Sequence, residues 1–294
     1  MKRILITGAN KGIGFATAVA LLEQRPDVVV LLCSRDAQRG QAALEDIAAR
    51  NSEWASRTEL LQLDVADSTS VHAARESITA RFAAEMTPLF GIVNNAGIGF
   101  HSDDLQATLN VNTLGVKRVC DALLPLLAEG GRIVNVSSAA APNFVSGCAT
   151  ERRTFFQDAS LEWSDIQGLI DAVASAGGDS QRLQALGVNE FNPYGFSKAC
   201  VSLYTLVLAR QHPEFGINAC TPGFIETDLT RPVAQARGMA PSELGMAPPQ
   251  QGTTAILHLL FGQLSGNGHY YGSDAKRSPL DRYRAPGSAE YCGD

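Results

Sequence analysis

The sequence lacks any apolar run that approaches the ~18 residues of a membrane-spanning helix. Lys2 and Arg3 precede only the short run Ile4–Ile6, so no secretory signal is predicted. Basic residues do not cluster, and 24 Lys and Arg against 30 Asp and Glu leave a net charge of −6. We therefore expect neither nucleic acid nor a membrane surface as a partner.

Cysteine is scarce, and no two cysteines have the Cys-x-x-Cys spacing of a zinc or redox motif. The six are Cys33, Cys120, Cys148, Cys200, Cys220 and Cys292. Scattered cysteines of this kind predict reduced thiols in a cytoplasmic protein, with no disulfide framework and no metal site. The remaining composition, 45% apolar and 18% charged, is that of an ordinary globular protein.

Short apolar runs alternate with segments of helical periodicity along most of the chain. The runs predicted as strands are Arg3–Thr7, Val28–Cys33, Glu59–Leu63, Leu89–Asn94, Arg132–Ser137 and Gly216–Cys220, with a weaker one at His269–Gly272. The predicted helices are Gly12–Gln24, Ala37–Arg50, Ser68–Glu85, Asp103–Leu127 and Tyr194–Gln211. This alternation predicts an α/β fold with a doubly wound parallel sheet of about seven strands, of the Rossmann type. Ligands of such folds bind beyond the carboxyl ends of the strands.

One segment interrupts the alternation, because Tyr194 follows Ser138 by 56 positions. Within this gap four apolar residues have helical spacing, and Gly177 and Gly178 follow as a stop signal. The four are Ile166, Leu169, Ile170 and Val173. We predict a helical insertion over residues 139–193 within a single unit spanning 1–294. The tail after Ser278 contains no clear predicted element.

A glycine-rich turn joins the first predicted strand to the first predicted helix. Residues 7–14 are TGANKGIG, which places Gly8, Gly12 and Gly14 where a pyrophosphate could approach the backbone and the helix amino terminus. The alternative is a turn that binds nothing, but its position after a strand and before a helix favours a dinucleotide. The spacing Gly-x3-Gly-x-Gly differs from the common Gly-x-Gly-x-x-Gly fingerprint.

The end of the second predicted strand distinguishes the two nicotinamide dinucleotides. A carboxylate there accepts hydrogen bonds from the ribose of NAD, whereas an arginine fits the 2′-phosphate of NADP. Ser34 and Arg35 favour NADP, and Lys11 could supply a second positive charge. Two alternatives stay open: Arg35 as a surface charge, and Asp36 as the N-cap of the helix that starts near Ala37.

Tyr194 and Lys198 are four residues apart at the start of a predicted helix and therefore share one face. A phenol is a poor acid or base at pH 7, and a neighbouring ammonium is expected to lower its pKa. Taken alone, a Tyr-x3-Lys pair is too common to indicate a function.

Four further motifs accompany the pair in a fixed order. They are the Thr7–Gly14 loop, Asn94-Asn95-Ala96-Gly97 after the fourth predicted strand, Asn110-Val111-Asn112 in the next helix and Ser137-Ser138 after the fifth strand. In this order and in these elements the chain resembles the short-chain dehydrogenases/reductases, from Met1 to about Gly272.

The resemblance implies a catalytic set of Asn112, Ser138, Tyr194 and Lys198. Tyr194 would act as general acid in reduction and as base in oxidation, and Ser138 would hydrogen-bond the substrate oxygen. Lys198 would hold the nicotinamide ribose, and Asn112 would help to hold a water that links Lys198 to solvent. Ser137 is the serine with the structural role. Ser138 as a strand cap and Asn112 as a solvent-facing side chain are the alternatives.

The resemblance also implies the residues that contact the dinucleotide. Asp64 would contact the adenine amino group, Asn94 would shape the adenosine pocket, and Ile225 and Thr227 would meet the carboxamide or pyrophosphate. The full implied set is Gly8, Asn10, Lys11, Gly12, Ile13, Gly14, Arg35, Asp64, Val65, Asn94, Ala96, Gly97, Tyr194, Lys198, Pro222, Gly223, Ile225 and Thr227.

Within the family, residues 10–14, 34–36 and 194–198 resemble the monomeric NADPH-dependent carbonyl reductases. The implied activity is reduction of a small-molecule ketone, aldehyde or quinone with NADP(H), and the insertion would cover the usual dimer surface and leave a monomer. The alternatives are a regulatory NADP sensor on the same fold, an alcohol dehydrogenase working in the oxidative direction, and an epimerase or dehydratase of sugar nucleotides. Apolar residues available for a substrate wall, although more often found in cores, are Phe144, Trp163, Phe191, Phe224 and Met246.

Overall fold

A computed structural model describes residues 1–99 and 104–293 of the chain. Eight strands form one sheet in the order β3-β2-β1-β4-β5-β6-β7-β8. All neighbouring pairs are parallel except β7 and β8. The strands are β1 Lys2–Ile6, β2 Val28–Ser34, β3 Thr58–Gln62, β4 Leu89–Asn94, β5 Leu127–Val136, β6 Gly216–Cys220, β7 Tyr270–Tyr271 and β8 Arg277–Ser278. The predicted doubly wound parallel sheet is confirmed.

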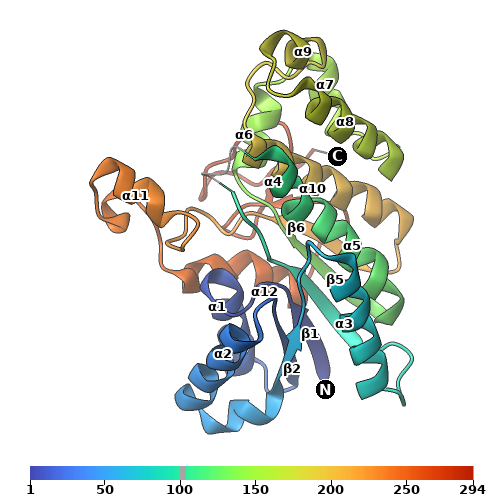
Figure 1. Cartoon of the computed structure of the whole chain (residues 1–294), viewed down its shortest axis with the longest axis vertical. Helices are drawn as coiled ribbons and strands as arrows, with labels where there is room; N and C mark the ends of the chain where they lie inside the picture. The colour runs from blue at the N-terminus through green and yellow to red at the C-terminus, as the bar shows by residue number, and fades with distance from the viewer. Residues whose placement is uncertain (100–103, 294) are drawn as a thin grey trace.

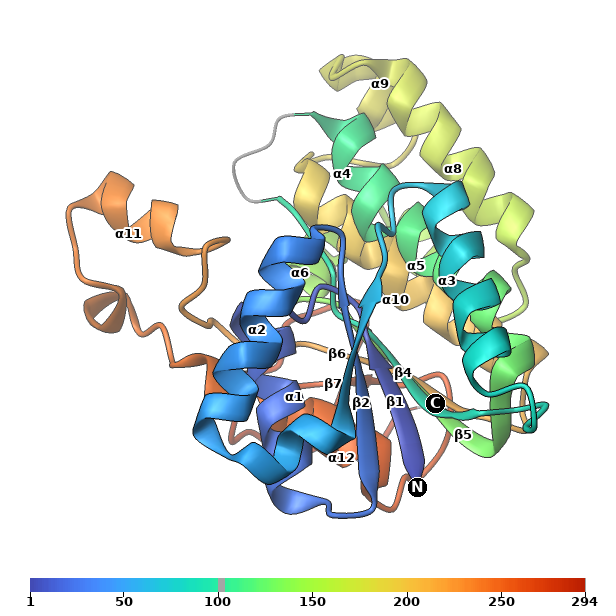
Figure 2. The same cartoon turned by 60° about the horizontal axis from the view of Figure 1, so that its bottom comes forward.

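Helices cover both faces of this sheet (Figures 1 and 2). Helices α1 (Gly12–Gln24), α2 (Ala37–Arg50) and α12 (Thr254–Phe261) lie on one face. Helices α3 (Ser68–Arg81), α4 (Leu105–Asn112), α5 (Leu114–Leu123) and α10 (Pro193–Gln211) lie on the other. The short 3-10 helices are Ser52–Arg57, Leu124–Leu126, Pro241–Leu244 and Pro249–Thr253.

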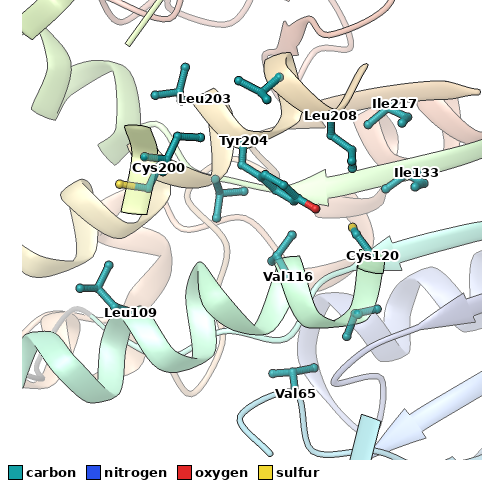
Figure 3. Packing of buried hydrophobic residues seen from close by; sticks show 14 of the residues in the cluster. Val65, Leu109, Val116, Cys120, Ile133, Cys200, Leu203, Tyr204, Leu208 and Ile217 are labelled. Carbon is teal, nitrogen blue, oxygen red and sulfur yellow. The ribbon is translucent and has the colours of Figure 1, made fainter. Parts of the chain in front are cut away.

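Alternation of side chains along each strand supplies both hydrophobic cores. In β1, Ile4 and Ile6 pack with α1 and α12, whereas Leu5 packs with the helices of the opposite face. In the larger core α5 and α10 pack on the sheet, and the Tyr204 ring lies between them with its hydroxyl toward Cys120 (Figure 3). The sheet is therefore buried on both faces, which explains its nearly continuous apolar strands.

The segment between β5 and α10 contains four helices: α6 Ala140–Ser146, α7 Thr150–Phe155, α8 Trp163–Ala176 and α9 Ser180–Ala185. Helix α8 buries the predicted apolar face of Ile166, Leu169, Ile170 and Val173. It ends at Gly177, whose φ of 60° is the left-handed conformation that favours glycine at a helix end. Helix α8 packs on α10 at the side of the molecule.

Several details differ from the sequence prediction, which did not include α12 and continued the third predicted helix to Glu85, beyond the end of α3 at Arg81. The predicted helix Asp103–Leu127 is two helices, α4 and α5, that meet at Thr113, and Asp103 lies outside the described residues. Strand β5 begins at Leu127, before the predicted Arg132, with Gly130 in the left-handed region and an irregular register beside β4. The eighth strand is added by Arg277–Ser278, which turns back on β7.

Candidate active site

The carboxyl ends of the strands border a cavity of about 1420 Å³. It spans the point where the sheet order reverses between β1 and β4, the position at which ligands of doubly wound sheets bind. Its walls come from the loops after β1 to β6, the segment around α11 (Arg231–Arg237) and the C-terminal tail. In Figure 1 α11 projects from the body of the molecule beside this edge of the sheet.

The glycine-rich turn after β1 has the backbone that the sequence predicted. Gly8 and Gly12 have φ values of 63° and 59°, in the left-handed region. A Cβ on Gly14 would lie 2.5 Å from Asn95 Nδ2 and 2.7 Å from the Gly8 carbonyl oxygen, so Gly14 allows α1 to pack against the turn. Lys11, the N-cap of α1, forms no side-chain cap within the described residues. The first backbone N–H groups of α1 can therefore face an anion.

The loop after β2 places two arginines on the cavity wall, Arg35 and Arg39. Arg35 is exposed, and no hydrogen bond from its side chain occurs within residues 1–99 and 104–293. Asp36 caps α2, because its Oδ1 accepts a hydrogen bond from the Arg39 backbone N–H at 3.0 Å. The Asp36 carboxylate therefore acts as the N-cap of α2, which is one of the two alternatives that the sequence left open. Arg39 has no counterpart in the sequence prediction.

Lys11 does not join these arginines. Its Nζ lies 2.5 Å from Asp228 Oδ2, on the loop that follows β6. This hydrogen bond and the charge of Lys11 lower the pKa of Asp228, and Arg231 also pairs with the same carboxylate. Lys11 therefore joins two walls of the cavity that it lines, and its contact with a phosphate stays a prediction.

The loops after β3 and β4 form the next part of the wall. Asp64, Val65, Ala96 and Gly97 all line the cavity, as the sequence predicted. Asn94 does not: it is 2% exposed and donates a 2.8 Å hydrogen bond to Asn135 Oδ1 within the core. Because the Asn94 side chain points into the core, it does not face the cavity. The next residue, Asn95, lines the cavity instead.

Tyr194 enters the cavity from the first turn of α10. Asn192 caps this helix by accepting a 2.8 Å hydrogen bond from the Gly195 N–H, and Pro193 occupies its first position. Ser138 hydrogen-bonds Tyr194, and its Oγ also accepts a 3.1 Å hydrogen bond from the Ala140 N–H. The phenol and the serine hydroxyl therefore face the same space.

The ionisation of Tyr194 differs from the expectation. Burial raises the pKa of Tyr194, and the hydrogen bond with Ser138 lowers it only in part. The expected lowering by the Lys198 ammonium is not found, because its Nζ donates to the Val136 carbonyl oxygen and lies 5.9 Å from the centre of the Tyr194 ring. Burial lowers the pKa of Lys198 from 10.5 to about 8. At neutral pH the Tyr194 phenol is consequently protonated.

Lys198 lines the cavity, and Asn112 lies behind the lining residues. Lys198 is 4% exposed and its Nζ donates to the Val136 carbonyl oxygen at 2.8 Å. Asn112 is fully buried, accepts from the Ile98 N–H at 2.9 Å and donates to the Ile98 carbonyl oxygen at 2.7 Å. Its amide also donates to Ser197 Oγ at 3.0 Å, so it joins the loop after β4 to α10. The solvent-facing alternative for Asn112 is wrong.

Ser137, by contrast, is buried against α10. Its Oγ pairs with Ser202 Oγ at 2.8 Å and donates to the Lys198 carbonyl oxygen at 3.0 Å. This is the structural role that the sequence predicted for it.

The loop after β6 lines the cavity beside the glycine-rich turn. Pro222, Gly223, Ile225 and Thr227 all line it, and Gly223 has a φ of 96°. The Ile225 carbonyl oxygen accepts a 2.6 Å hydrogen bond from Thr230 Oγ1, which holds the loop in place. A Cβ on Gly12 would lie 3.5 Å from Thr227 Cγ2, so this loop approaches the glycine-rich turn closely.

Of the five apolar residues considered for the wall, only Phe224 lines this cavity. Phe144 and Phe191 pack on Phe196, and Trp163 packs edge-on against Tyr204 in the core. Tyr283 and Arg284 of the C-terminal tail also line the cavity. No sequence signal pointed to them, because a tail without periodicity gives no indication of where it folds.

The described residues contain no helix long and apolar enough to span a membrane. Nor does any group of three or more His, Cys, Asp or Glu side chains in 1–99 and 104–293 have the geometry of a metal site. All six cysteines are free, and only Cys292 is exposed.

Comparison with known proteins agrees with this fold and cavity. The family model described as short chain dehydrogenase matches residues 2–150. Carbonyl reductase (NADPH) 1 of Mus musculus is 30% identical over 262 residues, covering 83% of this chain and 91% of the relative. Carbonyl reductase (NADPH) 3 of Mus musculus is 32% identical over 265 residues with the same coverage. This chain belongs to the short-chain dehydrogenase family.

A solved structure extends the similarity beyond the residues that the family model matches. Salutaridine reductase from Papaver somniferum superposes with a TM-score of 0.74 at 25% identity, covering 92% of this chain and 99% of that one. Because 92% of this chain is covered, the similarity includes most of the C-terminal half.

Proposed function

We propose that this protein is an NADPH-dependent oxidoreductase that reduces a ketone, aldehyde or quinone to an alcohol, with Tyr194 as the general acid. The observation that carries the proposal is the hydrogen-bonded Ser138–Tyr194 pair in the same cavity as the glycine-rich turn. The relatives named carbonyl reductase (NADPH) support the same activity.

The cavity fits a nicotinamide dinucleotide along its length. A Cβ on Gly8 would lie 3.0 Å from Ala96 Cα, so glycine there lets the turn pack closely against the loop after β4. The backbone of this turn, before the start of α1, would hold the pyrophosphate. Arg35 and Arg39 would hold a 2′-phosphate, and Asp64 and Val65 would border the adenine. Lys198 would hold the nicotinamide ribose, and the loop Pro222–Thr227 would hold the carboxamide. The cofactor supplies the hydride when bound.

The residues of this chain would then manage the proton and the charge on the substrate oxygen. Ser138 would donate a hydrogen bond to the carbonyl oxygen and stabilise the negative charge that develops there. Tyr194 would donate its phenolic proton to the same oxygen. A phenol carries its proton at neutral pH, and burial of Tyr194 keeps it protonated until the transfer.

The oxidative direction requires the opposite state, because a base must accept the alcohol proton. Burial of Tyr194 makes the phenolate costly in this structure, and Lys198 is 5.9 Å from the ring centre. The proposal of reduction rests on the relatives named carbonyl reductase (NADPH). A regulatory sensor would need only the dinucleotide site and would have no use for the Ser138–Tyr194 pair.

We further propose that the chain acts as a monomeric unit over 1–294, with residues 139–193 as an insertion within it. The start of α8 covers the outer surface of α5 and α10. Trp163 lies under the Lys117 ammonium of α5, 5.1 Å away, and packs on Tyr204 of α10. Glu162 accepts a hydrogen bond from Gln211 at 2.6 Å. These contacts leave little of that helical face for a second subunit.

An NADPH-oxidation screen over ketones, aldehydes and quinones tests the proposed function, with NADH as the control cofactor. Turnover of at least one carbonyl class with preference for NADPH is expected. Tight NADPH binding without turnover of any class would favour the sensor.

A further inference from the structure

Few large apolar side chains remain exposed in the described part of the chain. They are Met1, Met86, Phe224, Met239 and Tyr283. The two aromatic ones, Phe224 at 40% exposure and Tyr283 at 52%, are also the two that line the active-site cavity. Exposed aromatic side chains beside a cavity are characteristic of surfaces that bind an apolar group.

Phe224 and Tyr283 come from segments that lie in contact, although 59 positions separate them in the sequence. A Cβ on Gly223, beside Phe224, would lie 3.2 Å from Ser273 Cβ. A Cβ on Gly272 would lie 2.9 Å from Arg284 Nη2, beside Tyr283. Ser273 and Gly272 are adjacent, so these contacts join the two aromatic residues into one stretch of wall.

Tyr283 lines the same cavity as Tyr194 and Ser138. An apolar group bound beside the catalytic pair can therefore share this cavity with the Tyr283 ring.

The tail that carries Tyr283 is fixed by a polar cluster. The Arg284 side chain is 7% exposed and forms an ion pair with Asp274. Its Nε donates to Ser278 Oγ at 3.0 Å, and its Nη1 donates to the Ser288 carbonyl oxygen at 3.0 Å. Asp274 Oδ2 in turn accepts the Gly287 N–H at 2.9 Å. The guanidinium is thus used to hold the tail, and Tyr283 stands on a fixed backbone.

We infer that Tyr283 and Phe224 are specificity-determining residues that select carbonyl compounds with an aromatic or bulky apolar body. This inference rests on the proposed function. With the carbonyl oxygen at Ser138 and Tyr194, the rest of the substrate extends toward the two rings. The cavity lining also includes the small, uncharged residues Ala139, Ala140 and Gly223. An apolar body there loses contact with water and gains contact with the rings, whereas a short ketone reaches neither.

The test compares 4-phenyl-2-butanone with 2-butanone, which share the methyl ketone and differ by the phenyl group. For wild type, we expect a higher kcat/KM for the phenyl ketone. Tyr283→Ala should lower the ratio of the two kcat/KM values about 3- to 10-fold, the size of one lost aromatic contact. Tyr283→Phe should retain the ratio, because the ring and not the hydroxyl makes the contact. Phe224→Ala should lower it like Tyr283→Ala.

Tyr291→Ala is the matched control, because Tyr291 lies in the same tail and packs on Arg282 outside the cavity lining. An unchanged ratio in Tyr283→Ala, or an equal loss in Tyr291→Ala, would overturn the inference. Calorimetric binding of 4-phenyl-2-butanone to the protein with NADP⁺ separates this result from the proposed function. A 3- to 10-fold weaker Kd in Tyr283→Ala supports the inference even if neither ketone is turned over, and an unchanged Kd contradicts it.

Discussion

Lys198 follows Tyr194 by one turn of α10, yet its ammonium donates to the Val136 carbonyl oxygen and lies 5.9 Å from the centre of the Tyr194 ring. Both groups are buried, and burial favours the neutral form of each. The pair therefore holds a protonated phenol beside an amine whose pKa is about 8. That state suits donation of a proton to a carbonyl oxygen.

The lowered pKa of Lys198 predicts a dependence of stability on pH. Between about pH 8 and pH 10.5 the unfolded chain binds the Lys198 proton and the folded chain does not. The free energy of unfolding should therefore rise with pH over this range, by up to about 3 kcal/mol from this group. Urea unfolding at several pH values measures the free energy of unfolding of wild type and of Lys198→Met. The difference between the two proteins isolates the effect of Lys198, because the other groups titrate in both. A difference that stays constant from pH 7 to pH 10 would contradict the lowered pKa.

Arg35 and Arg39 should set the preference for NADPH. Arg35→Ala and Arg39→Ala each remove a charge from the wall where the 2′-phosphate is expected. A charge-assisted hydrogen bond contributes about 1.5–3 kcal/mol, so the KM for NADPH should rise roughly 10- to 100-fold with little change for NADH. Arg50→Ala is the control, because Arg50 lies at the other end of α2 and pairs with Asp46. An equal rise in KM for NADPH and for NADH would show that the two arginines do not bind the 2′-phosphate.

Lys11 should contribute much less to NADPH binding than Arg35. Its Nζ pairs with Asp228, and both side chains are more than half exposed, at 57% and 56%. Exposed ion pairs contribute about 0–1 kcal/mol, so Lys11→Met should change the KM for NADPH by less than about 5-fold. A loss as large as that of Arg35→Ala would mean that Lys11 leaves Asp228 and binds the 2′-phosphate, as the sequence first indicated.

The covered face of α5 and α10 predicts a monomer in solution. Multi-angle light scattering should return the mass of one chain across a range of protein concentrations. A stable dimer or tetramer would mean that α8 leaves a usable interface, or that another surface forms one.

The sequence predicted the parts of the site that depend on local order along the chain. The glycine-rich turn, the strand ends and Tyr194 with Lys198 follow from short motifs and from the alternation of strands and helices. Two pairings were not predictable from local patterns. Lys11 meets Asp228 217 positions away, and Arg284 meets Asp274 in a tail whose sequence has no periodicity. The direction of the Tyr194 pKa was also missed, because it depends on how deeply the phenol is buried. The sequence prediction assigned the cavity wall to Asn94, whereas the structure has the next residue, Asn95, in that position. The short motif could not distinguish the two, because the strand register determines which of them lines the cavity.

The central claim is that Tyr194 supplies the proton in carbonyl reduction, and the turnover of Tyr194→Phe tests it most directly. With the best carbonyl substrate of the screen, kcat should fall at least about 100-fold, the usual contribution of a positioned general acid. The Kd for NADPH, measured by fluorescence, should stay within about 3-fold of wild type, because the phenylalanine ring keeps the packing of α10. A Tyr194→Phe variant that binds NADPH normally and retains full kcat would contradict the account.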